Sequence, residues 1–272
     1  MGDAMLISAG LGLVVGVVLA LTGAGGGILA VPLLVFGMQM GVAQAGPIGL
    51  LAVGMAAALG AVLGLKAGTV RYRAAVLISV TGMLLAPVGL WLAHRIDNRW
   101  LSVLFALVLL FVAFKTYRRA NSKPAEREDA TDGRTKPCML DSETGRFSWN
   151  ARCARSLALS GTLAGLLSGL LGVGGGFVMV PALQRYTNLD MKSTVATSLA
   201  VIALVSVTGV ASSAFAGSMT WSVAMPFAAG ALAGMLGGRV VSDRLAGPQL
   251  QIGFAAVSAL VAVGMIAKVL YR

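Results

Sequence analysis

Long apolar stretches separated by short polar segments dominate the pattern of hydrophobic and polar positions along this chain. Four such stretches occupy about residues 5–37, 46–65, 74–93 and 100–114, and four more occupy about residues 156–183, 194–216, 223–241 and 250–270. An α-helix needs about 20 apolar residues to cross a hydrocarbon layer about 30 Å thick. The pattern therefore predicts an all-α polytopic membrane protein with about eight transmembrane segments.

The two sets of stretches match one another at a constant offset of 149 residues, which pairs Gly23 with Gly172. The same offset pairs Gly16 with Gly165, Leu50 with Leu199, Gly89 with Gly238 and Phe105 with Phe254 without a gap. Repetition at a fixed period within apolar sequence indicates a duplicated membrane protein. We therefore expect a first transmembrane repeat over residues 1–114, a hydrophilic cytoplasmic linker over residues 115–155, and a second repeat over residues 156–272.

Each expected repeat contains one Gly-x-Gly-Gly-Gly motif, which a Val-Pro pair follows, at residues 23–32 and 172–181. The opening stretch of about 30 residues would form a helix about 45 Å long, too long for one crossing and short for two. Consecutive glycines and a proline disfavour a continuous helix, so we expect a break at each motif. Non-helical backbone persists at membrane depth only where protein buries it or it lines a wet cavity. Each break is therefore a candidate site.

The linker is the one strongly hydrophilic segment, with ten of the 21 basic and six of the ten acidic residues. With eight spans, the bias of Lys and Arg places the linker and both termini together in the cytoplasm. Four spans per half correspond to parallel repeats, whereas a hairpin at each glycine motif gives five segments and inverted repeats; both alternatives stay open. Cys138 and Cys153 lie in the linker without CxxC spacing, so in a cytosolic segment we expect free thiols.

The glycine motifs carry the main candidate chemistry. A helix that begins directly after a break presents unpaired N–H groups and the positive end of its dipole, and both attract anions. Two such helix ends that face each other where the repeats meet would form a site for a small anion. The alternative is that the glycines only allow close helix packing, as the GxxxG spacings at Gly12, Gly60, Gly161 and Gly230 suggest for those positions.

Thr197 and Ser198 are the strongest side-chain candidates, because they begin an apolar stretch in the half that contains the second motif. The alternative is that their hydroxyls bond to carbonyls of their own helix. Gln44, Thr22 and Ser193 are weaker candidates. The single histidine, His94, lies at the end of an apolar stretch, where an interfacial role is the alternative to proton coupling.

Composition excludes several other classes of protein. Only 11% of the residues are charged and 57% are hydrophobic, whereas soluble domains carry about 25% charged residues. The net charge of +11 does not indicate nucleic-acid binding, because no basic face can be built from these apolar segments. The apolar stretches contain no His, Asp, Glu or Cys cluster, so we expect no metal, no cofactor and no enzyme activity.

The paired glycine motifs, together with Ala-Thr-Ser-Leu at residues 196–199 and Gly-Ser-Met-Thr-Trp at residues 217–221, resemble the TauE/SafE family of sulfite exporters. The resemblance covers nearly the whole chain except the linker. It implies a multi-pass transporter of the bacterial inner membrane for small sulfur-containing anions such as sulfite, organosulfonates or sulfoacetate.

The resemblance also implies a set of substrate-binding positions. These are Gly23, Gly25, Gly26, Gly27 and Pro32, their counterparts Gly172, Gly174, Gly175, Gly176 and Pro181, and the donors Thr197 and Ser198. The first half departs from the pattern, because Ile48 and Gly49 stand where the second half has Thr197 and Ser198. Hydroxyl donors would then come from one half only. A structural or assembly membrane protein and an integral-membrane enzyme are the alternatives, and the sequence leaves oligomeric state, transport direction and coupling ion open.

Overall fold

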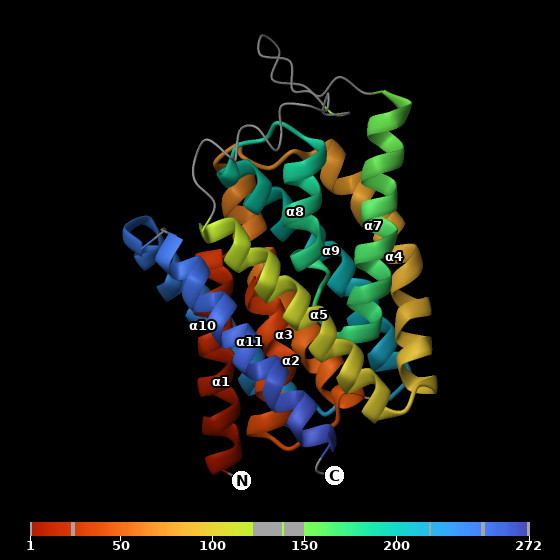
Figure 1. The fold of residues 1–272 in the computed structure, drawn as a ribbon, viewed down its shortest axis with the longest axis vertical. Helices are drawn as coiled ribbons and strands as arrows, with labels where there is room; N and C mark the ends of the chain where they lie inside the picture. The colour runs from red at the N-terminus through yellow and green to blue at the C-terminus, as the bar shows by residue number, and fades with distance from the viewer. Residues whose placement is uncertain are drawn as a thin grey trace.

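The computed structural model describes residues 2–22, 25–121, 138, 150–217, 219–245 and 248–270, and these residues form ten α-helices (Figure 1). They are α1 (Gly2–Thr22), α2 (Gly25–Gly37), α3 (Val42–Lys66), α4 (Tyr72–Arg95), α5 (Asn98–Asn121), α7 (Ala151–Leu171), α8 (Gly176–Tyr186), α9 (Met191–Phe215), α10 (Trp221–Leu245) and α11 (Pro248–Leu270). No β-strand occurs in these ranges, so the predicted all-α class is confirmed.

Seven helices of the described chain are long and apolar enough to cross a membrane: α1, α3, α4, α5, α7, α9 and α10. About eight spans were expected. The expected eighth span coincides with α11, in which the described apolar stretch is the shorter Ala255–Lys268. Helix α5 extends well beyond the expected stretch of residues 100–114, because its polar end continues to Asn121. The chain is therefore a multi-pass membrane protein.

The opening apolar stretch of each half contains two helices, so each half contributes five of the ten described helices. In the second half, α7 ends at Leu171 and α8 begins at Gly176. In the first half, α1 ends at Thr22 and α2 begins at Gly25, while Gly23 and Ala24 lie outside the described residues. The prediction that Gly23 takes part in the first break therefore cannot be placed in the structure.

Glycines bring the helices of the two halves into contact. Helix α3 packs against α9, and the contacts run antiparallel: Gly54 lies against Ser206, Gly60 against Leu199 and Gly64 against Ala196. These two helices correspond at the offset of 149 residues, and opposite directions are the arrangement that inverted repeats produce. The internal duplication itself stays a prediction from the sequence.

The first helix of each half packs against the fourth helix of the other half. Helix α1 lies along α10, and α7 lies along α4, in both cases in parallel (Figure 1). Backbone touches backbone at these contacts, since a Cβ on Gly165 would collide with Gly82 and one on Gly230 would collide with Ala9. The GxxxG glycines therefore have the packing role that the sequence suggested.

The described chain ends and the helix ends that flank the linker lie at opposite ends of the helix bundle. In Figure 1, α1 begins and α11 ends at the lower end, whereas α5 ends and α7 begins at the upper end. The prediction that linker and both termini share one side is therefore wrong for this structure. It rested on one crossing for each opening stretch, whereas the pairs α1–α2 and α7–α8 each reverse the chain direction once more.

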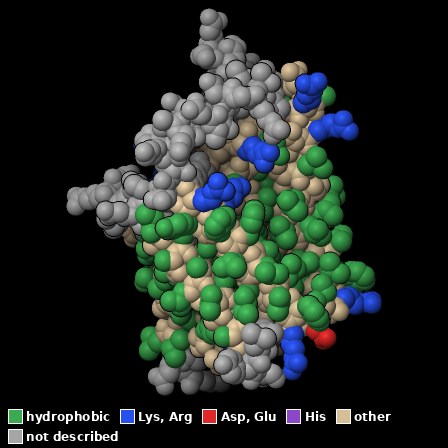
Figure 2. Space-filling model, in the orientation of Figure 1, with side chains coloured by type: hydrophobic (Ala, Val, Ile, Leu, Met, Phe, Trp, Pro, Cys, Tyr) green, Lys and Arg blue, Asp and Glu red, His purple; other side chains and the backbone are tan. Residues whose placement is uncertain are grey.

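The surface of the bundle fits a bilayer. In Figure 2, hydrophobic side chains cover the middle of the visible face, and Lys and Arg lie toward its upper and lower ends. The side chains of Leu84, Phe111 and Leu159 are 66–70% exposed. Large apolar side chains exposed to this extent are suited to contact with lipid hydrocarbon rather than water.

The two cysteines form a disulfide, which corrects the expectation of free thiols. Cys138 and Cys153 are both fully buried, and the bond ties the linker to the first turn of α7. The N–H of Cys138 also donates to the carbonyl oxygen of Tyr186 at 3.1 Å. Sequence spacing missed the pair because the partners meet through the packing of α7 against the end of α8.

Candidate functional site

The beginning of α2 and the α7–α8 break meet inside the bundle, beside Val53 of α3. A Cβ placed on Gly27 would lie 2.6 Å from the carbonyl oxygen of Val173 and 3.2 Å from a methyl group of Val53. A Cβ on Gly174 would lie 3.5 Å from the same methyl group. We call this place, where Gly27, Val53 and residues 172–176 meet, the glycine junction. It brings the N-terminal ends of two short helices together at one residue of α3.

Left-handed backbone shapes the junction in the second half. Gly172, Gly174 and Gly175 have φ angles of 71°, 76° and 69°, which residues with a side chain rarely adopt. Gly172 caps α7 through its N–H, which donates to the carbonyl oxygen of Ser168 at 2.8 Å. Gly175 precedes α8 and accepts from the N–H of Met179 at 3.2 Å. The glycines thus reverse the chain and begin α8 inside the bundle.

Close backbone approaches also require glycine here. A Cβ on Gly172 would collide with the backbone of Gly46 of α3, and a Cβ on Gly175 would lie 2.7 Å from the carbonyl oxygen of Ala164. In the first half, a Cβ on Gly26 would lie 2.6 Å from the Cα of Leu19 on α1. The junction is therefore densely packed.

Thr197 and Ser198 lie away from the junction, nearer the upper end of α9. Thr197 Oγ1 accepts from the N–H of Arg71 at 3.1 Å, and Ser198 Oγ donates to the carbonyl oxygen of Val195 at 2.8 Å. Both residues are fully buried. The Ser198 hydroxyl therefore bonds within its own helix, as the alternative interpretation of the sequence predicted. The Thr197 hydroxyl links α9 to the segment before α4.

The remaining candidates have separate places in the fold. Pro32 lies within α2 and Pro181 within α8, beyond the helix ends that form the junction. Thr22 donates its hydroxyl to the carbonyl oxygen of Val18 at 2.7 Å, within α1. The N–H of Ser193 donates to the carboxylate of Asp190, which caps α9, at 3.4 Å.

A hydroxyl group that sequence analysis did not single out lies at the junction. Ser206 of α9 is 2% exposed, and its Oγ lies 3.6 Å from the position of a Cβ on Gly174. This Oγ has no hydrogen-bond partner among the described residues. Ser168, in the last turns of α7, is also buried with an unpartnered hydroxyl. A periodicity signal could have found Ser206, because it lies two helical turns beyond Ser198 on the same helix.

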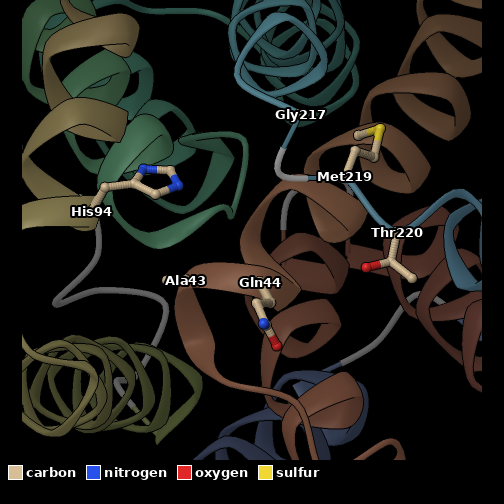
Figure 3. Close-up of a pocket in the computed structure, with 6 residues that line it drawn as sticks. All are labelled: Ala43, Gln44, His94, Gly217, Met219 and Thr220. Carbon is tan, nitrogen blue, oxygen red and sulfur yellow. The ribbon is translucent and has the colours of Figure 1, made fainter.

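A cavity of about 400 Å³ opens at the lower end of the bundle, lined by Ala43, Gln44, His94, Gly217, Met219 and Thr220 (Figure 3). His94 Nδ1 lies 2.8 Å from the carbonyl oxygen of Leu90, so Nδ1 carries the proton and Nε2 stays available. Figure 3 shows the imidazole pointing away from its helix toward the cavity. Gln44 stands two residues before Gly46, which touches Gly172. The cavity therefore lies close to the junction along α3.

Within the described residues, no group of three or more His, Cys, Asp or Glu side chains that could hold a metal ion occurs. The side chains of Val53, Ile202 and Ser206 and the backbone carbonyl of Val173 lie nearest to Gly27 and Gly174. Backbone N–H groups and one hydroxyl are therefore the donors that this place can offer.

Comparison with known proteins places the chain in a family. The model of the sulfite exporter TauE/SafE family matches residues 8–265, so the chain belongs to this family. The probable membrane transporter protein YunE of Bacillus subtilis (strain 168) is 28% identical over 239 residues, which cover 85% of this chain and 86% of the relative. A probable membrane transporter protein of Xylella fastidiosa (strain Temecula1 / ATCC 700964) is 31% identical over 247 residues, 89% and 87% of the two chains. No solved structure gave a significant match.

The class that fold and family define is therefore a multi-pass membrane transporter of the TauE/SafE family. The predicted family is confirmed. The expectation that the chain is not an enzyme is consistent with the names of these relatives.

Proposed function

We propose that this protein is a secondary transporter of small sulfur-containing anions, of the sulfite, organosulfonate or sulfoacetate type, and binds them at the glycine junction. The observation that carries the proposal is the convergence of the N-terminal ends of α2 and α8 on Val53 inside the bundle. The name of the matching family supports the substrate class. Lipid bilayer and a small anion are then the two partners.

The physical argument concerns how an anion is held in an apolar environment. Helix N-termini offer N–H donors and a partial positive charge without a side chain that must be desolvated as an ion. A lysine or arginine at this depth would bind the anion more tightly and would slow its release. Backbone donors at two facing helix ends therefore suit a carrier, which has to bind and then release its substrate.

The cavity at the lower end supports a route to the junction. Gln44, His94 and Thr220 provide polar groups at its wall, and Gly46 connects its wall to Gly172. At the upper end, the hydrogen bond from Arg71 to Thr197 joins the segment before α4 to α9. We assign the structure to a state in which the junction is approached from the lower end.

The distribution of basic residues favours one orientation in the bacterial inner membrane. Lys66 at the end of α3, Arg71 before α4 and Arg73 in its first turn lie at the upper end, where α5 also ends and α7 begins. Arg95, Arg99 and Lys268 lie at the lower end. The positive-inside tendency places the upper end and the linker in the cytoplasm and both termini outside. The buried disulfide between Cys138 and Cys153 is then an exception to the rule that cytosolic cysteines stay reduced.

A stability screen followed by a flux assay tests the proposed function. Thermal unfolding of the purified protein is measured with sulfite, thiosulfate, sulfate, taurine and sulfoacetate, and the stabilising anion is then used for uptake into proteoliposomes. We expect a sulfur-containing anion to raise the melting temperature and to cross the bilayer only in protein-containing vesicles. Absence of both stabilisation and flux for every anion would favour a structural membrane protein.

A further inference from the structure

Ser206 is a buried polar side chain that the fold leaves without a partner. It is 2% exposed, and its Oγ makes no hydrogen bond within the described part of the chain. An unpaired buried hydroxyl costs folding free energy, about 1–3 kcal/mol in mutational data. Most other hydroxyls in these helices bond to a carbonyl of their own helix, as Ser213 does to Gly209 at 2.8 Å. Four buried serines of the described residues depart from this pattern: Ser79, Ser168, Ser206 and Ser258.

This hydroxyl lies close to two glycines of other segments. The Oγ lies 3.2 Å from the position of a Cβ on Gly54 of α3 and 3.6 Å from the position of one on Gly174. Gly174 stands two residues before the first residue of α8 and has a left-handed φ of 76°. The hydroxyl, on α9, thus lies beside the glycine segment that leads into the N-terminal end of α8. Of the four unpartnered serines, Ser206 is the one that lies among the nearest neighbours of a junction glycine, Gly174.

We propose that Ser206 is the side-chain donor for the transported oxyanion, and that its O–H and the N–H groups at the start of α8 bind the same anion. This assignment rests on the proposed function and replaces Thr197 and Ser198 as the hydroxyl donors. A hydroxyl donates one hydrogen bond to an oxygen of a sulfite or sulfonate group, and α8 supplies the dipole. Residue 57, which corresponds to Ser206 in the first half, is alanine, so the donor comes from one half only.

The proposed arrangement predicts selection for an oxyanion over a simple halide. A halide is spherical and gains from the helix dipole alone, whereas an oxyanion presents several oxygens at fixed angles to separate donors. The hydroxyl of Ser206 and the N–H groups of α8 approach from two helices and can bind two oxygens of one group. Loss of the hydroxyl should therefore weaken sulfite or sulfonate binding more than chloride binding.

The test compares Ser206→Ala with Ser213→Ala, the same change at a buried serine of the same helix whose hydroxyl is already bonded. Affinity for the anion selected in the stability screen, and for chloride, is measured by calorimetry on full-length protein in nanodiscs. We expect Ser206→Ala to bind the sulfur anion at least about tenfold more weakly, the effect of one hydrogen bond to a charged partner. Its melting temperature without ligand should equal or exceed that of the wild type. Ser213→Ala should keep the wild-type affinity.

The outcomes separate this inference from the proposed function. Wild-type affinity in Ser206→Ala would overturn the role of Ser206 and leave anion transport intact. If the wild type itself bound none of the five anions, both the proposed function and this inference would be wrong. Ser206→Cys provides a second variant of similar size with a weaker donor, and an affinity between those of wild type and Ser206→Ala is expected. Wild-type affinity in Ser206→Cys would show that the strength of the donor does not matter and would contradict the donor role.

Discussion

Gly46 of α3 and Gly172 at the end of α7 touch through their backbones, so that a Cβ on Gly172 would collide with Gly46. The contact joins the two halves of the chain beside the glycine junction. It also connects the wall of the lower cavity, through Gln44, with the segment that starts α8. A shift of α3 against α7 would therefore change the junction and the cavity together.

The glycines between paired helices should tolerate substitution less well than glycines that face lipid. Gly165→Ala places a methyl group against the backbone of Gly82, and overpacking of this kind costs about 1–3 kcal/mol. Gly237→Ala is the control, because its Cβ meets no atom within 4 Å and alanine favours helix. We expect the melting temperature to fall for Gly165→Ala and to stay or rise for Gly237→Ala. Equal stability of the two variants would contradict the packing.

Thr197 should act on stability rather than on substrate affinity. Thr197→Ala removes the acceptor of the Arg71 N–H, at an expected cost of about 1–3 kcal/mol of unfolding free energy. Thr197→Ser keeps the hydroxyl and should keep most of this stability. Chemical denaturation measures the free energy of unfolding, and calorimetry measures the affinity for the anion. A loss of anion affinity in Thr197→Ala at full stability would return this residue to the binding site.

The acidic cap of α9 should make stability depend on pH. The hydrogen bond from Ser193 lowers the pKa of Asp190 below its ordinary value of 3.8. Because the folded-state pKa is depressed, the charged cap stabilises the fold above pH 3.8, and this contribution is lost as pH falls through the folded-state pKa. Asp190→Ala should cost about 1 kcal/mol near neutral pH. The difference from wild type should shrink below pH 3.8.

Asp190→Asn is the matched variant for this measurement, since its amide oxygen also caps a helix but carries no charge. Near neutral pH its stability should lie between those of wild type and Asp190→Ala. Its stability should not show the loss at acid pH that protonation of Asp190 causes in the wild type. Melting temperatures of the three proteins across pH 3–7 decide the point. A constant difference between wild type and Asp190→Ala at every pH would show that the charge has no part in capping.

The topology can be tested with reporter fusions. Alkaline phosphatase is active only outside the cytoplasm, so a fusion at the C-terminus should be active and one placed after Asn121 inactive. Green fluorescent protein at the same two positions should give the reverse pattern. The expectation follows from the opposite ends at which α5 and α11 finish, together with the positive-inside tendency. Equal activity at both positions would contradict the helix order of the structure.

Much of the helical architecture could be predicted from apolar length alone, because a hydrocarbon layer requires about 20 apolar residues for each crossing. The reversal between α1 and α2 could not, since a broken single helix and a hairpin have the same composition. That ambiguity led to the wrong prediction that the termini and the linker share one side. The polar end of α5 was also missed, because residues such as Lys115 and Arg118 continue a helix beyond the hydrocarbon without an apolar signal.

The part of the candidate site that depends on backbone conformation could be predicted from the sequence. Gly172, Gly174 and Gly175 adopt the left-handed backbone that a run of glycines indicates. Hydroxyl positions were not predictable, because Thr197 and Ser206 differ only in which neighbours the packing of α9 provides. Cys138 and Cys153 were missed for the same reason, since three-dimensional proximity decides whether two cysteines pair.

The junction as the binding place is tested most directly by Gly174→Ala. The added methyl group enters the junction against Ile202, and left-handed backbone adds strain of about 1–3 kcal/mol. Gly68→Ala is the control, because Gly68 has a similar φ of 68° but its Cβ would meet no atom within 4 Å. It therefore reproduces the backbone strain without entering the junction.

The decisive measurement is the affinity for the selected sulfur anion in these two variants, at matched amounts of folded, monodisperse protein. We expect Gly174→Ala to lose at least about tenfold in affinity, equivalent to one hydrogen bond to a charged group, and Gly68→Ala to bind as the wild type does. Wild-type affinity in Gly174→Ala would mean that the glycine segments only shape the bundle and that the anion binds elsewhere.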